Sequence, residues 1–304
     1  MTRPLPEAES KHGLVIVDKP GGMTSHDVVA RIRRLAGTRR VGHAGTLDPM
    51  ATGVLVVGVE KATRLLGYLT LTEKRYDATI RLGQSTATDD AEGEITGTAP
   101  AAGVSAETLA TAVNALTGEI SQIPPAVSAI KVDGRRAYRL TRAGQAPELK
   151  PRPVTVHEFT VTAIRRSGDL LDVDATVRCS SGTYIRALAR DLGAALGTGG
   201  HLVRLRRTRV GGYGLDHART LEQLAERFEV MPLAQAAAAA FPRRDLSADE
   251  ARRLAHGARL PAVALEAPGT RERPTAAYAP DGSLVALLTE QAGQARPLVV
   301  FTAG

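Results

Sequence analysis

Four strand-like segments of two kinds constrain the fold of this chain most strongly. Residues 14–17 and 54–59 are unbroken apolar runs, which are typical of buried strands. Residues 76–82 and 171–179 alternate between apolar and polar side chains, which indicates strands with one buried face. The polar face of the last segment carries Asp172, Asp174, Thr176 and Arg178.

Helical patterns lie between these strands in irregular order. Residues 105–116 and 184–196 are periodic and are followed by Gly118 and Gly197, and another helix begins near Ser25. Two capping boxes mark further helix starts, Thr220 with Gln223 and Ser247 with Glu250. This irregular mixture predicts an α+β fold rather than a doubly wound parallel sheet.

The chain divides into a large and a small predicted domain. An alanine run over residues 234–240 ends at Phe241-Pro242, so we expect domains at 1–240 and 241–304. Asp281-Gly282 separates two apolar segments of the small domain and predicts a hairpin. Residues 124–153 lose all periodicity and are rich in Pro, Gly and basic residues, which predicts a long excursion from the core.

Charge and composition favour some partners and exclude others. The net charge of +7 favours a polyanion such as nucleic acid, although an arginine-rich genome would produce a similar excess. The only cysteine, Cys179, excludes an intrachain disulfide and fits a reducing cytoplasm, and we find no signal peptide or membrane-length apolar segment. Seven scattered histidines give no metal-ligand spacing, so no metal or other cofactor is expected.

The loop GHAGTLDPMATG, residues 42–53, leads into the apolar segment 54–59. Its Asp48-Pro49 pair is typical of a turn, but a carboxylate mounted before a rigid strand is also a candidate reactive group. A second acidic group, Asp89, Asp90 and Glu92, is typical of a solvated turn, a cation site or a glycosidase partner for Asp48. A phosphate-binding loop is excluded, because Val59 and Glu60 stand where Lys and Ser/Thr are required.

Seven stretches together resemble the bacterial TruB family of pseudouridine synthases, which modify uridine 55 in the T-loop of tRNA. Besides GHAGTLDPMATG they are DKPGGMTSHDVV, KRYDATIRLG, TATDDAEG, PPAVSAIKVDGRRAYRLTRAG, CSSGTYIRALARDLG and HLVRLRRTRVGGYGL, and they cover most of residues 13–215. The resemblance implies a mixed, largely antiparallel central sheet flanked by helices, and a small, mostly β, PUA-like RNA-binding domain at the C-terminus. It also implies a cytoplasmic enzyme that needs no cofactor, guide RNA or obligate protein partner.

The resemblance assigns roles to individual residues. Asp48 matches the essential aspartate and Arg186, two residues after Tyr184 in GTYIR, matches the arginine that pairs with it. Tyr76 matches the aromatic residue that stacks on the target base, which must first be flipped out of the folded T-loop. The other matches are His43 near the vacated stack, Leu205 in the uracil pocket and Lys19 in a Lys-Pro motif.

RNA contacts are expected from two basic clusters. Charge runs are usually solvated faces, but these two lie within stretches that match RNA-binding parts of the family. The first cluster contains Arg204, Arg206, Arg207 and Arg209, and the second contains Lys131, Arg135, Arg136 and Arg142. Val127 and Ser181 depart from the family pattern, which often has an aromatic residue and a lysine at these places.

Three alternatives remain open on the sequence. The chain could be a non-catalytic RNA-binding or RNA-folding protein, but intact Asp48, Tyr76 and Arg186 favour an enzyme. It could be a guide-RNA-dependent synthase, but the long basic excursion resembles the stand-alone type. It could be a glycoside hydrolase that uses Asp48 with Asp89 or Asp90, which requires carboxylates about 5 to 9.5 Å apart.

Overall fold

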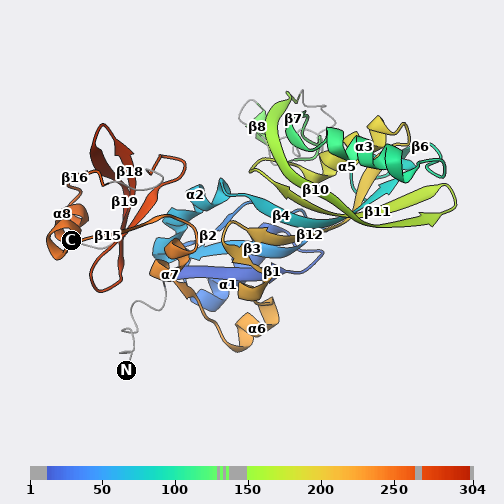
Figure 1. Ribbon diagram of the computed structural model, residues 1–304. Helices are drawn as coiled ribbons and strands as arrows, with labels where there is room; N and C mark the ends of the chain where they lie inside the picture. The colour runs from blue at the N-terminus through green and yellow to red at the C-terminus, as the bar shows by residue number, and fades with distance from the viewer. Residues whose placement is uncertain (1–11, 129–130, 133–134, 137–148, 264–268, 302–304) are drawn as a thin grey trace.

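A computed structural model describes residues 12–128, 131–132, 135–136, 149–263 and 269–301 of the chain. Figure 1 shows a large sheet with helices packed on it, followed by a small sheet at one end of an elongated molecule. The α+β class predicted from the sequence is confirmed. No helix of the described segments is long and apolar enough to cross a membrane.

The large sheet is mixed and largely antiparallel. Every strand pair in it is antiparallel except β3 with β12, which run parallel over two residue pairs only. In spatial order its strands are β14 (Met231–Pro232), β1 (Gly13–Lys19), β3 (Thr52–Val59), β12 (Gly200–Val210), β4 (Lys74–Leu82), β11 (Leu170–Cys179), β10 (Arg152–Ser167) and β7 (Gly118–Gln122); β2 (Val41–Ala44) pairs with β3, and β13 (Tyr213–Gly214) pairs with β12.

The short parallel contact joins two half-sheets that diverge from it. Arg206 and Arg207 of β12 lie opposite Thr52 and Gly53 of β3. Gly53 has φ +97°, and a Cβ atom there would lie 2.2 Å from the Arg207 carbonyl oxygen. Only glycine therefore lets the two strands approach this closely. The loop 45–51 enters β3 at this junction, which places it where the half-sheets separate.

Gly53→Ala is expected to lower the free energy of unfolding by about 2–4 kcal/mol, because it adds a backbone clash to a left-handed φ. Urea denaturation measures this change. Gly97→Ala is the matched control, since Gly97 has no atom within 4 Å of its Cβ position and no positive φ. Equal stability of the two variants would contradict this account of the junction.

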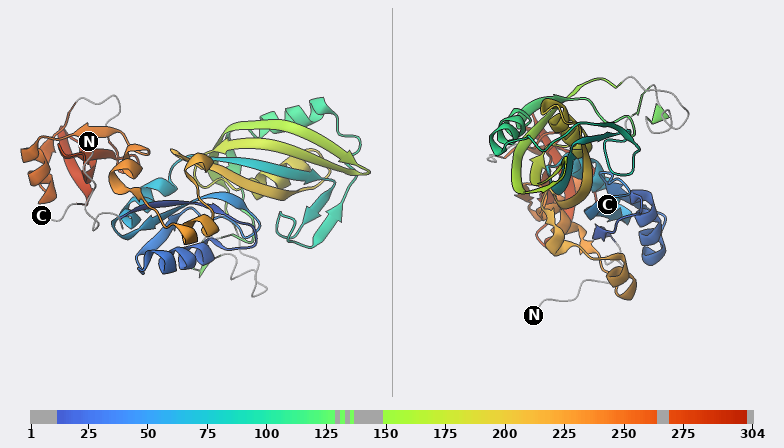
Figure 2. Two further views of the ribbon diagram at one scale, coloured as in Figure 1. Left: turned by 90° about the horizontal axis from the view of Figure 1, so that it is seen from below. Right: turned by 90° about the vertical axis from the view of Figure 1, so that its right-hand side faces the viewer.

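Helices cover the half-sheets on different faces. On the β1–β3 half, α1 (Ser25–Ala36) and α6 (Leu221–Glu226) pack on one face, and η1 (Glu60–Leu65), α2 (Leu66–Thr70) and α7 (Leu233–Ala238) on the other. On the β4–β11 half, α3 (Ala106–Ala115) and α5 (Ile185–Ala195) cover one face only. The uncovered face carries Asp172, Asp174, Thr176 and Arg178, as the alternation predicted. Figure 2 shows both half-sheets from two further directions.

Local signals place the helix starts. The predicted capping boxes at Thr220 and Ser247 are both present, at the starts of α6 and of α8 (Ala248–Ala255). A third capping box, Thr24 with Asp27, begins α1. Outside the small C-terminal sheet, the remaining described elements are η2 (Leu215–His217) and two small hairpins, β5 (Gln84–Thr86) with β6 (Ile95–Thr98), and β8 (Lys131–Val132) with β9 (Arg135–Arg136) in the excursion.

The small C-terminal sheet has the order β15 (Arg243–Asp245), β17 (Thr275–Tyr278), β18 (Leu284–Gln291), β19 (Gln294–Val300) and β16 (Leu260–Pro261). The predicted hairpin at Asp281-Gly282 connects β17 to β18. The alanine run forms α7, whose Ala236 and Ala237 are buried in one core with Tyr278 and Leu284 of the small sheet. The chain changes sheets between β14 and β15, and the domain division at residue 240 stays a prediction.

Candidate active site

Asp48 lies on the loop between β2 and β3, at the junction of the half-sheets. Its carbonyl oxygen accepts a hydrogen bond from the Ala51 amide at 3.1 Å, so Asp48-Pro49 does form a turn. Ser25, at the start of α1, donates to the Leu47 carbonyl at 3.1 Å and accepts from the Leu47 amide at 2.9 Å. The backbone that carries the Asp48 carboxylate is therefore fixed by the turn and by the two hydrogen bonds between Ser25 and Leu47.

Lys19 braces the other end of this turn from inside the protein. It is fully buried, and its Nζ donates to the carbonyls of Pro20 at 2.7 Å, Met23 at 2.6 Å and Pro49 at 3.1 Å. Burial lowers the pKa of Lys19 to about 8. All three N–H groups are used by backbone carbonyls, so Lys19 supports the loop, and a direct role of Lys19 in substrate binding stays a prediction.

Arg186 and Asp48 form an ion pair. The Asp48 carboxylate lies 3.0 Å from Nε and 3.2 Å from Nη2 of Arg186. The Arg186 side chain is 4 % exposed, whereas that of Asp48 is 34 % exposed. The arginine is thus a buried partner behind a carboxylate that remains open to an incoming molecule. Arg186 comes from the first turn of α5, which packs on the covered face of the β4–β11 half-sheet.

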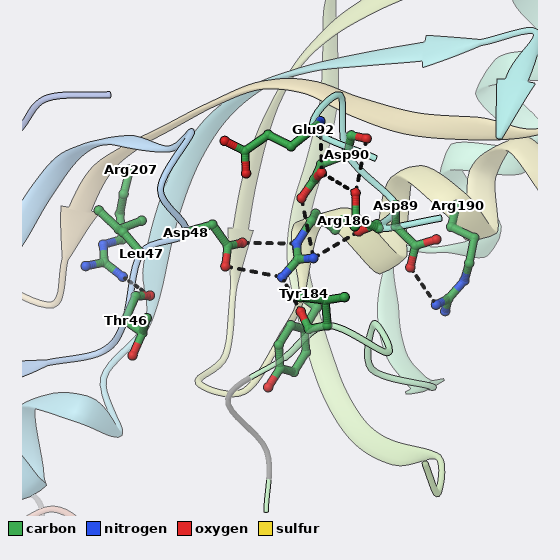
Figure 3. Close-up of polar contacts among 12 residues, drawn as sticks. Thr46, Leu47, Asp48, Asp89, Asp90, Glu92, Tyr184, Arg186, Arg190 and Arg207 are labelled. Atoms are coloured by element: carbon green, nitrogen blue, oxygen red, sulfur yellow. Dashed lines mark hydrogen bonds and ion pairs between the residues drawn. The ribbon is translucent and has the colours of Figure 1, made fainter. Parts of the chain in front are cut away.

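Asp90 is a second carboxylate on the same guanidinium, and the sequence analysis did not single it out from the acidic loop. Its side chain is 5 % exposed and lies 3.4 Å from Nη1 of Arg186. Asp90 also accepts hydrogen bonds from the Thr88 hydroxyl and the Glu92 amide. Figure 3 shows Asp48 and Asp90 meeting Arg186 from different sides. Only the tertiary contact distinguishes Asp90 from Asp89, which pairs with Arg190 instead at 3.1 Å.

Two backbone carbonyls also accept hydrogen bonds from the Arg186 guanidinium. Nη1 donates to the Thr88 carbonyl and Nη2 to the Val127 carbonyl, both at 2.9 Å. Val127 lies at the beginning of the long excursion, so the excursion is tied to Arg186 by its backbone. This contact needs no aromatic side chain, and the departure at Val127 does not disturb it.

Gln122, which the sequence analysis missed, fixes the start of α5. Its side-chain amide donates to the Tyr184 carbonyl at 3.1 Å and accepts from the Tyr184 amide at 2.8 Å. Tyr184 is the N-cap residue of the helix that carries Arg186. A single glutamine at the end of an unremarkable strand gives no signal in the sequence.

Tyr76 and Leu205 lie on the sheet face that α5 covers. They are 8 % and 6 % exposed, and they share a core with Leu47 and Ala51 of the Asp48 loop. Burial raises the pKa of Tyr76, so the phenol stays neutral. His43 lies on β2, with its ring 5.6 Å from that of His26 in an edge-to-face arrangement. Tyr76 and Leu205 therefore lie together beside the Asp48 loop, and the base-pocket roles of these residues and of His43 stay predictions.

The first basic cluster does not form one surface. Strand alternation places Arg204 and Arg206 on the uncovered face, away from Tyr76, and a bulge between Arg207 and Arg209 brings Arg209 to the same face. There Arg206 pairs with Asp18 at 2.7 Å. Arg207 points inward and is 1 % exposed. The four residues therefore do not form one surface beside the active site, and their assignment to RNA binding stays a prediction.

The second basic cluster is only partly described. Lys131, Arg135 and Arg136 belong to β8 and β9 of the excursion. Arg142 lies outside the described residues. The assignment of these four residues to RNA binding stays a prediction.

A basic surface that the sequence analysis did not identify lies at the end of the β2–β3 hairpin opposite to the Asp48 loop. Its members come from α1, the loop after it and η1, and we call it the α1–η1 basic surface. They are Arg34, Arg39, Arg40, Lys61 and Arg64, which line two adjoining depressions that share Lys61. Glu60, paired with Arg40 at 4.0 Å, lies among them, and Arg64 donates to the Val300 carbonyl of the small sheet at 2.7 Å. The surface therefore runs from the β2–β3 hairpin to the small C-terminal sheet.

Solved structures with the same fold define the class of protein. The chain superposes on a crystal structure of a Cbf5-Nop10-Gar1 complex with a TM-score of 0.76 and 29 % identity, covering 99 % of this chain and 88 % of that one. An H/ACA RNP bound to a substrate RNA containing 2'-deoxyuridine gives a TM-score of 0.73, 26 % identity and coverage of 99 % and 88 %. The fold is that of the pseudouridine synthases.

Sequence comparison then shows the family. Residues 33–185 match the N-terminal domain of the TruB family pseudouridylate synthases, residues 186–236 a tRNA pseudouridylate synthase B C-terminal domain, and residues 241–302 a tRNA pseudouridine synthase II C-terminal domain. The tRNA pseudouridine synthase B of Thermobifida fusca is 64 % identical over 95 % of this chain and 98 % of its own. That of Streptomyces griseus is 58 % identical over 95 % and 97 %. The chain belongs to the TruB family and is a pseudouridine synthase, an isomerase, which answers the glycoside hydrolase alternative.

Proposed function

We propose that this chain isomerises uridine 55 in the T-loop of tRNA to pseudouridine, with Asp48 as the essential group and without a guide RNA or cofactor. One observation carries the proposal. The partly exposed carboxylate of Asp48 is held by the buried Arg186 beside Tyr76 and Leu205, at the junction where the family motif occurs. The names of the relatives support tRNA as the substrate.

The reaction conserves the atoms of the nucleoside. The bond from N1 to C1' breaks, the uracil turns, and C5 bonds to C1' while the C5 proton leaves and N1 gains one. An ionised, positioned carboxylate serves either as a nucleophile or as a base in such a step. A guanidinium always carries its charge, so Arg186 supports the charged form of its partner. The reaction needs no oxidant, reductant or energy source.

Access to the ribose requires that the uridine leaves its stack, because a base inside a folded loop shields its glycosidic bond. In this proposal Tyr76 stacks on the flipped base, and Leu205 and Tyr184 line the pocket that receives the uracil. His43 occupies the space that the flipped base leaves in the stack of the T-loop. The apolar, buried surroundings of Tyr76 and Leu205 support this placement. They also keep water from the glycosidic bond.

The tRNA backbone is proposed to follow the α1–η1 basic surface. Arg39, Arg40, Lys61 and Arg64 line a depression of about 360 Å³ at the edge strand β2. Phosphate contacts there would release counterions and dominate the affinity. The surface ends at Val300 of the small domain, which fits RNA binding by both predicted domains.

The double variant Arg39→Glu with Arg40→Glu is expected to weaken tRNA binding by about 10-fold or more and to flatten the dependence of Kd on salt, because phosphate contacts are lost. Filter binding at several salt concentrations measures both quantities. The matched control is Arg204→Glu with Arg209→Glu on the uncovered face of the sheet. If the control weakens binding as much as the test variant, the RNA path proposed here is wrong.

Tritium release tests the function itself. The protein alone is mixed with a tRNA transcript labelled at C5 of its uridines, and with a transcript that carries cytidine in place of uridine 55. Release of one equivalent from the first transcript and none from the second supports the proposal. Binding without release would favour an RNA-folding protein, and release only after a guide RNA is added would favour the guide-dependent class.

A further inference from the structure

Arg207 is a buried arginine whose guanidinium is surrounded by backbone carbonyls. Nε donates to the Val54 carbonyl at 2.7 Å and Nη2 to the Gly45 carbonyl at 3.1 Å, with a longer contact from Nη1 to the Thr46 carbonyl at 3.5 Å. Figure 3 shows the last contact beside Asp48. Among the described residues no carboxylate forms an ion pair with Arg207.

A guanidinium buried without a counter-charge is costly, so its place in the core calls for a reason. The planar fork of arginine supplies several N–H groups in fixed directions, which a lysine ammonium does not. Here the guanidinium contacts three backbone carbonyls, two on the loop that leads to Asp48 and one on β3. Arg207 thus joins the loop to the strand into which the loop runs.

The other braces of the loop act at different points. Ser25 holds Leu47, and Lys19 holds Pro49. Arg207 alone among these three side chains contacts the segment before Leu47, where Gly45 has φ +85°. A Cβ atom at Gly45 would lie 3.5 Å from Nη1 of Arg207, so the loop passes close to the guanidinium.

Arg207 also faces the base platform. It lies directly opposite Tyr76 in the antiparallel pair of β12 with β4, and both side chains point to the covered face of the sheet. The one residue therefore touches the loop that carries Asp48 and adjoins the ring proposed to stack on the base. Any shift of the guanidinium changes the position of the carboxylate relative to that ring.

We infer that Arg207 is a positioning residue that sets the Asp48 loop against the Tyr76 platform, in addition to the ion pair from Arg186. This inference rests on the proposed function, because it assigns a task to the same carboxylate. Arg207 does not touch the substrate. Its effect is on the rate of the chemical step, since a displacement of about 1 Å in a reacting group costs up to about 100-fold.

Arg207→Lys tests the inference, because it keeps the charge but loses the fork. The matched control is Arg206→Lys, the neighbouring residue on the opposite face. Single-turnover tritium release, Kd for the tRNA transcript and the urea midpoint are measured for both. We expect a fall in rate of about 10- to 100-fold for Arg207→Lys at saturating enzyme, with Kd within threefold of wild type, and wild-type values for Arg206→Lys.

Two further measurements separate positioning from loss of fold. Arg207→Ala is assayed with millimolar methylguanidinium, which we expect to restore part of the rate by binding in the vacated space. Hydrogen exchange of the segment 42–53 is expected to be faster in Arg207→Lys than in Arg206→Lys, and it is read without any RNA. A wild-type rate in Arg207→Lys, or a loss of rate that only follows the unfolded fraction, would overturn the inference. An inactive wild type with normal exchange differences would instead overturn the proposed function.

Discussion

Asp48→Asn is expected to abolish pseudouridine formation, with a fall in rate of at least about 10⁴-fold, the size of loss seen when a nucleophile that acts with its partners is removed. An amide is nearly the same size as the carboxylate but carries no charge and is neither a base nor an effective nucleophile. The affinity for tRNA is expected to stay within a few-fold of wild type, because one uncharged residue replaces one of many contacts. Tritium release and filter binding on the same preparation measure the two effects.

Asp18→Asn is the matched control for this variant. Asp18 also pairs with an arginine, Arg206, at 2.7 Å, and the Arg206 side chain points to the sheet face opposite to that of Tyr76. It is expected to retain wild-type turnover. Full turnover by Asp48→Asn would refute the assignment of the active site, and equal loss in both variants would show a general effect of breaking ion pairs.

Arg186→Lys is expected to have the second-largest effect, a fall in rate of roughly 100- to 1000-fold, equivalent to about 3–4 kcal/mol. Arg186 is in contact with Asp48, Asp90 and the carbonyls of Thr88 and Val127. A lysine ammonium keeps one positive charge but cannot reach all of these groups from one position. Disrupting a buried pair leaves charges poorly compensated, which costs about 3–5 kcal/mol when a partner is removed entirely.

Arg190→Lys provides the comparison for Arg186→Lys. Arg190 lies one turn further along α5 and pairs with Asp89 and Asp191, but its side chain is 30 % exposed. This pair is half-buried and does not include Asp48, so we expect turnover close to wild type and a change in stability of about 1 kcal/mol. If both substitutions reduce turnover equally, the buried pair with Asp48 has no special role.

The two carboxylates on Arg186 also explain why the acidic loop is not a simple turn. Asp90 is buried by contacts from Thr88 and Glu92 within its own loop, and it reaches a helix that lies about 100 residues away in the sequence. Asp89, its neighbour, has a different arginine. Adjacent residues in a loop thus take different partners, because the backbone turns between them, with φ +60° at Asp89.

Local patterns were sufficient for much of the secondary structure. The alternation of residues 171–179 predicted a strand with one polar face, and β11 has this face. Thr220 and Ser247 predicted helix starts, since a capping box involves only residues within one turn. The family motifs pointed to the Asp48 loop and to Arg186, and the structure brings the two side chains together.

The sequence alone was insufficient wherever a role depends on which face a side chain occupies or on a distant partner. Arg204, Arg206, Arg207 and Arg209 form one basic run along the chain, but strand geometry places one of them in the core and three on the uncovered face. Gln122 and Asp90 acquire their contacts only when β7, the acidic loop and α5 meet. By itself the sequence determined the class of fold and pointed to the Asp48 loop, because local periodicity and a short motif carry both. The tertiary structure decided which charged side chains are buried and paired and which are exposed, because burial and pairing arise from segments that are far apart in the chain.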